Sequence, residues 1–170
     1  MKQHFNMYAA YNRWANDRVY AEAALLTQEA RDRNMGAFFR SITGTLNHIL
    51  VADRIWLKRF TGGGDAPTRL DAILFAEFDR LTAAREKEDQ RLQDWVESLD
   101  EDALAGRITY MTATDMRTIS QRLAPALLHV FNHQTHHRGQ VHAMLTALGR
   151  PSVQLDLLAF QRMPEGLAYA

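Results

Sequence analysis

The histidines of one short segment are the residues of this chain best suited to metal chemistry. The segment HVFNHQTHHRGQVH spans residues 129–142 and holds five of the seven histidines in the sequence of 170 residues. Neutral imidazole is a common protein ligand of transition metals. Two histidines four residues apart on a helix can reach one point. His133 and His137 have this spacing, so we predict that they bind one divalent metal ion.

A helical wheel favours this pair over the other histidines of the segment. The core-facing side is marked by apolar residues, namely Val130, Val141, Met144, Leu145 and Leu148. His137 falls on this side and His133 lies beside it. His129 and His136 lie progressively outside, and His142 lies beyond the far edge. The alternative interpretation is that these are core or surface histidines without a ligand role.

A third ligand has to come from another part of the chain, where His4 and His48 are the remaining histidines. His48 lies in the middle of a predicted helix, which is a more rigid platform than a helix terminus. On the wheel, however, His48 sits off the main apolar stripe of that helix. Asp53 lies near the middle of the stripe, where it is expected to pair with Arg13 or Arg18 or to orient a histidine. We favour the pairing.

Apolar residues recur at helical spacing along most of the chain. The predicted long helices span residues of about 3–26, 37–60, 72–98 and 121–149. Gly62 begins a run of three glycines that ends the second helix. Pro125 is tolerated only in a first turn, so the fourth helix has to begin just before it.

A β-hairpin is predicted between the third and fourth helices. Residues of high β-propensity follow Gly106, and a turn is predicted at Thr114 and Asp115. The segment LDLLAFQR predicts a short fifth helix near the C-terminus. The expected fold is therefore all-α: a single domain over residues 1–170, built as a four-helix bundle with a small β-hairpin before the fourth long helix and a short C-terminal helix.

The composition and the absent motifs narrow the functional classes. Lys plus Arg and Asp plus Glu both number 20, so the net charge is zero, which argues against a nucleic-acid or membrane partner. The chain has no cysteine, which excludes disulfides and a protein thiol nucleophile. The N-terminus lacks the apolar run of a signal peptide, so we expect a cytoplasmic protein. The sequence contains no H-E-x-x-H, P-loop or G-x-S-x-G motif.

Three segments of the chain resemble the DinB-like superfamily of helical bundles, also described as YfiT-like metal-dependent hydrolases. They are YNRWANDRVY, SITGTLNHILVADRIWLKRF and HVFNHQTHHRGQVHAMLTALG, and the resemblance covers nearly the whole chain. It implies a divalent metal, nickel or zinc, held by one histidine of the second long helix and the H-x-x-x-H pair of the fourth. At the matching positions stand His48, His133 and His137.

The resemblance also implies a reaction. Several members of the superfamily use a low-molecular-weight thiol, which the metal activates. We therefore expect a thiol-dependent transferase that acts on small electrophilic molecules, with the thiol supplied from solution. The alternative is a non-catalytic metal-binding stress-response protein or a dimeric scaffold. A closed centre with a fourth protein ligand, such as His129 or His136, would favour that alternative.

The sequence also predicts an oligomeric state and roles for polar residues outside the histidine set. Relatives commonly pair through their bundles, so a homodimer is expected. The first two helices also carry more large apolar residues than one inner face needs, namely Trp14, Phe38, Phe39 and Trp56. The alternative is that these residues fill the core. At least one of Asn12 and Asn16 is expected to line or support the metal pocket; bonds to backbone or to Asp53 are the alternative. Arg138 is assigned to structural bonding. Metal affinity should fall below about pH 6, as histidine becomes protonated.

Overall fold

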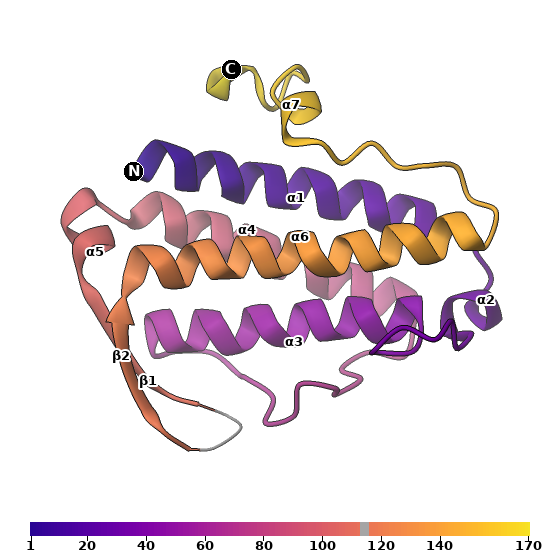
Figure 1. Cartoon of the computed structure of the whole chain (residues 1–170), viewed down its shortest axis with the longest axis horizontal. Coiled ribbons are helices and arrows are strands. Elements are labelled where there is room, and N and C mark those ends of the chain that lie inside the picture. The colour runs from indigo at the N-terminus through magenta and orange to yellow at the C-terminus, as the bar shows by residue number, and fades with distance from the viewer. Residues whose placement is uncertain (113–115) are drawn as a thin grey trace.

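Four long helices pack side by side in the computed structural model of this protein, which describes residues 1–112 and 116–170 (Figure 1). They are α1 (Lys2–Ala24), α3 (Ile42–Thr61), α4 (Phe78–Ser98) and α6 (Leu123–Ala147). This architecture confirms the predicted four-helix bundle. Within the described residues, no helix has both the length and the apolar character that a membrane crossing requires.

Two of the long helices begin later than the sequence predicted. α3 begins at Ile42, because the Ser41 hydroxyl caps it by accepting a hydrogen bond from the Gly44 N–H at 3.1 Å. α4 begins at Phe78 and not near residue 72. The preceding segment is bound instead by the buried amide of Asn47, whose oxygen accepts hydrogen bonds from the backbone N–H groups of Leu74 and Phe75. At both positions a side chain binds backbone groups that would otherwise belong to a longer helix, which explains the later starts of α3 and α4.

The structure confirms the predicted C-terminal end of α3 and the predicted start of α6. Gly62 has a φ of 73° and terminates α3 in the left-handed conformation that glycine adopts without steric cost. Pro125 lies in the first turn of α6, which starts at Leu123. There its missing N–H removes no helical hydrogen bond.

The hairpin and the short helices complete the fold. The strands β1 (Arg107–Met111) and β2 (Thr118–Arg122) pair antiparallel, with Tyr110 opposite Ile119. The predicted turn at Thr114 and Asp115 lies outside the described residues. The short C-terminal helix is α7 (Leu157–Phe160). The described residues form three further short helices that were not predicted: α2 (Gln28–Asp32), α5 (Glu101–Ala105) and the 3-10 helix Leu167–Tyr169.

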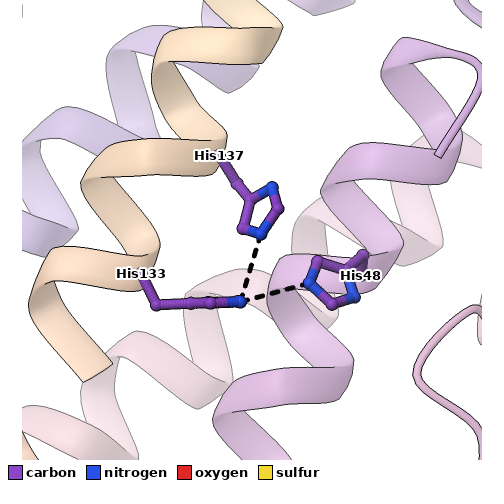
Figure 2. A group of neighbouring side chains, drawn as sticks. All are labelled: His48, His133 and His137. Carbon is purple, nitrogen blue, oxygen red and sulfur yellow. Dashed lines mark hydrogen bonds between the residues drawn. The ribbon is translucent and has the colours of Figure 1, made fainter. Parts of the chain in front are cut away.

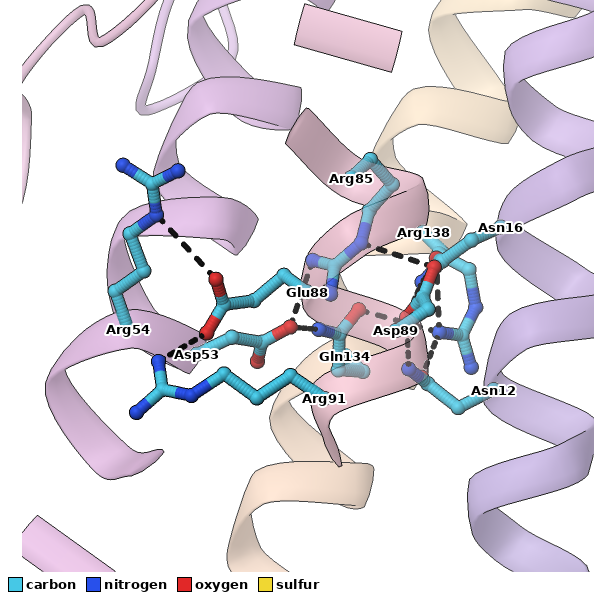
Figure 3. Close-up of polar contacts among 10 residues, drawn as sticks. All are labelled: Asn12, Asn16, Asp53, Arg54, Arg85, Glu88, Asp89, Arg91, Gln134 and Arg138. Carbon is cyan, nitrogen blue, oxygen red and sulfur yellow. Dashed lines mark hydrogen bonds and ion pairs between the residues drawn. The ribbon is translucent and has the colours of Figure 1, made fainter. Parts of the chain in front are cut away.

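The interior of the bundle is divided into apolar and polar layers. One apolar cluster contains Val19, Leu46, Leu81 and Leu145, and a second, toward the other end, contains Phe5, Leu57, Leu92 and Leu127. Between them lies a layer of buried polar side chains to which all four long helices contribute (Figure 3). We call it the polar layer; its members are Asn12, Asn16, Asp53, Arg85, Asp89, Gln134 and Arg138.

Arg85 connects the two buried carboxylates of the polar layer. Its Nη1 lies 2.7 Å from Asp53 and its Nε lies 3.0 Å from Asp89. Asp53 also accepts a hydrogen bond from Gln134. Asp53 is therefore a buried ion-pair partner, as favoured from the sequence, but its partner is Arg85 and neither Arg13 nor Arg18. Arg85 lies on α4, whose packing against α3 no sequence pattern indicated.

Arg138 and the two asparagines of α1 lie at the other end of the polar layer. Arg138 donates hydrogen bonds to the side-chain oxygens of Asn12, Asn16 and Gln134. The amides of Asn12 and Asn16 donate to Asp89 at 3.1 and 3.0 Å. The structural assignment of Arg138 is thus confirmed. The predicted place of an asparagine beside the metal pocket was wrong, because both amides are occupied by Asp89 and Arg138 in the bundle interior.

Candidate metal centre

The three histidines predicted as metal ligands meet between α3 and α6 (Figure 2). The Nε2 atom of His133 lies 3.2 Å from Nε2 of His48 and 3.1 Å from Nε2 of His137. One ligand atom from each ring lies within 4.8 Å of the others, so the three residues could hold one metal ion. His48 and His137 are buried and His133 is half-buried.

The position of His48 follows from the width of the buried face of α3. Its wheel neighbours Thr45, Ala52 and Ile55 are also buried, so this helix buries far more than one narrow stripe. α3 lies against α4 on one side and α6 on another. The side chain that seemed off the apolar stripe consequently points at α6, where His133 and His137 lie.

Two hydrogen bonds orient the rings. Nδ1 of His48 lies 2.8 Å from the carbonyl oxygen of Leu70, and Nδ1 of His137 lies 2.8 Å from Oε1 of Gln140. Both partners are acceptors, so in each ring Nδ1 carries the proton and donates it, while Nε2 keeps its lone pair for a metal. Sequence reasoning missed both contacts. Gln140 follows His137 by three residues on the same helix, so its spacing could have identified it. Leu70 lies in a loop, where no spacing rule points to a contact with His48.

Phe39 covers the histidine cluster from the segment that precedes α3. Its ring stacks on His48 with centroids 3.7 Å apart and meets His137 edge-on at 5.6 Å. Such packing restricts the rotamers of both histidines and excludes water from that side. Phe39 therefore supports the site, a role that the sequence did not reveal.

Burial lowers the pKa of all three histidines. Desolvation is the largest cause in each, and it lowers the pKa of His133 to about 3, helped by the neighbouring His137 and His48. Desolvation disfavours the charged imidazolium. The metal-free cluster is thus neutral at pH 7, which is the form that binds metal.

Metal affinity is expected to persist below pH 6, in contrast to the expectation from free histidine. Protons compete for Nε2 only as the pH approaches the pKa values in the folded protein, and burial moves these below the ordinary value near 6.5. A titration of Zn²⁺ affinity against pH checks this. Affinity that falls steeply between pH 7 and 6 would show that the rings are hydrated and titrate normally.

The other histidines of α6 stay outside the cluster. His129 packs on Trp56, with ring centroids 5.2 Å apart, and His136 lies near the amide nitrogen of Gln140 at 3.3 Å. Neither belongs to the group of residues whose ligand atoms share one point, as far as the described residues go. In the described part of the chain the cluster therefore offers three candidate metal ligands and no fourth.

A pocket of about 250 Å³ adjoins the cluster. It lies between α3, α6 and the hairpin, and its lining includes His48 and His133. The remaining lining residues are Ala52, Ile55, Trp56, Arg59, Leu70, Tyr110, Thr112 and His129. A metal ion bound by the three histidines would accordingly face a space large enough for a small organic molecule.

Fold and site together define a helical bundle with a candidate three-histidine metal centre beside an open pocket. The sequence profile of the DinB family matches residues 1–167. The chain is also 30% identical over 162 residues to Protein DinB of Bacillus subtilis (strain 168), covering 89% of this chain and 90% of that protein. The chain belongs to the DinB family.

A solved structure supports the fold independently. The crystal structure of a DinB-like protein from Bacillus cereus ATCC 10987 superposes with a TM-score of 0.63, covering 82% of this chain and 89% of that chain. At 15% sequence identity this likeness shows the shared fold.

Replacing Gln140 by alanine is expected to weaken Zn²⁺ binding about 10- to 100-fold, the usual effect of losing a partner that orients a metal ligand. Without the Gln140 oxygen, Nδ1 of His137 loses its acceptor and the ring loses its fixed tautomer. Competition with a chromophoric chelator measures the affinity. Asn132→Ala, an exposed position on the same helix, is the matched control and should bind like wild type.

Proposed function

We propose that this protein is a metal-dependent enzyme whose centre binds nickel or zinc through His48, His133 and His137. We further propose that it transfers a low-molecular-weight thiol to small electrophilic molecules. The observation that carries the proposal is the convergence of three neutral histidines on one point beside an open pocket. Catalytic metal sites commonly combine three protein ligands with an exchangeable position, whereas structural sites are closed by four.

The residues of the site suit the activation of an external nucleophile. A divalent metal there would lower the pKa of a bound thiol or water. The chain supplies only nitrogen ligands, and no carboxylate joins the cluster within the described residues. Since the chain has no cysteine, the thiol has to come from solution. In the transfer, the thiol sulfur bonds to the electrophilic carbon, the leaving group departs with its bonding pair, and the thiol proton passes to water.

Metal analysis followed by a thiol-conjugation screen tests the proposal. The purified protein should contain about one nickel or zinc ion per chain. A panel of electrophiles with glutathione, bacillithiol or mycothiol should then show turnover that His48→Ala abolishes. Stoichiometric metal without turnover for any thiol would contradict the transferase and favour a metal-binding protein without catalysis.

We also propose a homodimer, because DinB-like proteins commonly pair. Three of the four apolar residues that suggested an interface have partners within the chain: Trp14 packs on Phe160, Phe39 on His48, and Trp56 on Tyr110. Phe38 meets the ring of Phe39 edge-on, with centroids 4.9 Å apart, yet it remains 86% exposed and is the one of the four that presents a large apolar surface. Light scattering should return twice the chain mass of 19.4 kDa. A value equal to one chain at micromolar concentration would refute the dimer.

A further inference from the structure

Arg59 occupies an unusual position in the pocket beside the histidines. Its guanidinium carbon lies 4.6 Å from the ring centroid of Trp56 and 4.5 Å from that of Tyr110. The two rings are themselves in edge contact, with centroids 5.3 Å apart. Trp56 belongs to α3 and Tyr110 to β1, so the hairpin completes a corner that holds the guanidinium against two aromatic faces. Cation–π contacts of this kind fix the position of an arginine.

The charge of Arg59 has no carboxylate partner among the described residues. None of the ion pairs in residues 1–112 and 116–170 involves Arg59, and no Asp or Glu lines the pocket. Arg54 on the same helix, by contrast, pairs with Glu88 at 3.5 Å. Burial lowers the pKa of Arg59, and the positive charge of Arg59 contributes to lowering the pKa of His129. The guanidinium of Arg59 is thus only partly hydrated and gives the pocket wall a positive charge.

The pocket joins Arg59 to the histidine cluster. His48 and Arg59 are both on α3 and line the same cavity. Their Cα atoms are separated by about 16 Å along the helix axis, at about 1.5 Å per residue. The Arg59 side chain leans toward the N-terminus of α3, as helical side chains do, so its guanidinium lies on the side of its Cα atom that faces His48. The hydroxyl of Tyr110 accepts a hydrogen bond from Gln121 at 3.2 Å, which leaves its own proton available for a ligand.

We propose that this pocket is the substrate subsite for a small organic carboxylate, whose carboxylate group binds Arg59 while its reactive end lies at the histidine cluster. Arginine binds a carboxylate through two parallel hydrogen bonds. Trp56, Ile55 and Ala52 provide an apolar wall for the carbon chain between the two ends. The inference rests on the proposed function in that it names the substrate class of the same centre.

A carboxylate fits the pocket better than a phosphate ester. The single cation of Arg59 matches one negative charge, whereas a phosphate monoester carries about −1.5 to −2 at pH 7. The excess charge would remain unpaired beside the rings of Trp56 and Tyr110. The single cation and the apolar wall therefore select a monoanion with a carbon chain.

Two matched thiols test the subsite in protein loaded with Co²⁺. The probes are 6-mercaptohexanoate and 6-mercaptohexanol, which differ in the charged end, and the readout is the cobalt–thiolate absorption band. Wild type should bind the carboxylate about 10- to 100-fold more tightly, the range for hydrogen bonds to charged groups. Arg59→Gln and Arg59→Met should both abolish this preference and retain full cobalt content. Lys58→Gln removes a neighbouring exposed charge outside the pocket and should keep the preference.

A second measurement needs neither metal nor thiol, which separates this inference from the proposed function. Ligand-observed NMR on metal-free protein should detect hexanoate but not hexanol, and the hexanoate signal should be lost in Arg59→Gln. Failure to bind cobalt, or to form the thiolate band with either thiol, would contradict the proposed metal function and leave the NMR result to decide the subsite. Equal cobalt-band affinities for the two thiols, or hexanoate binding that survives in the Arg59 variants, would overturn the subsite.

Discussion

Replacing His133 by alanine is expected to reduce the metal content of the protein from about one ion per chain to nearly none. His133 is the central member of the cluster, because its Nε2 atom is the one in contact with Nε2 of both His48 and His137. Two histidines remain in the variant, which is one ligand short of a three-coordinate protein site. Elemental analysis of the dialysed protein measures the outcome.

The His133→Ala bundle should stay folded, since the ring is half-buried at the edge of the core and belongs to none of the apolar clusters. Circular dichroism should therefore show wild-type helicity. His4→Ala removes an exposed histidine of α1 and should retain full metal, which controls for non-specific loss. A His133→Ala protein with full metal content would show that the ion binds elsewhere.

Replacing Arg85 by alanine is expected to cost about 3–5 kcal/mol of unfolding free energy, the typical loss when one partner of a buried ion pair is removed. Arg85 is the cation between Asp53 and Asp89, both of which are buried. Without it the two carboxylates remain in the bundle interior with much less compensation. Chemical denaturation monitored by circular dichroism measures the change. At about 2–4 °C per kcal/mol for a chain of this size, the melting temperature should fall by about 10 °C.

Arg80→Ala is the matched control for this change, because Arg80 is exposed on the same helix; its effect should stay within about 0.5 kcal/mol. Asn12→Ala should cost about 1–3 kcal/mol, because it leaves Asp89 and Arg138 with one partner fewer. Neither Arg85→Ala nor Asn12→Ala should alter metal content while the bundle is folded. A stable Arg85→Ala protein would mean that water reaches the polar layer and solvates the carboxylates.

The sequence by itself determined the four long helices and two of the three histidines of the candidate centre. Apolar periodicity with Gly62 and Pro125 as punctuation located the long helices, because these signals act within a few residues of the chain. The spacing of His133 and His137 is likewise local, since four residues make about one turn and bring both rings to one face. The resemblance of three segments to DinB-like proteins then identified His48 as the third candidate ligand.

Only the tertiary structure decided what surrounds these residues. Local periodicity describes one face of a helix, but α3 buries parts of its surface against both α4 and α6, so His48 points to the centre although it lies off the main stripe. Phe39 and the carbonyl of Leu70 reach the histidines from segments outside the helices, which no spacing specifies. The sequence likewise predicted that at least one of Asn12 and Asn16 lies near the metal pocket. Helix docking instead joined both amides to Asp89 and Arg138, because a buried amide binds whichever partner the neighbouring helices present.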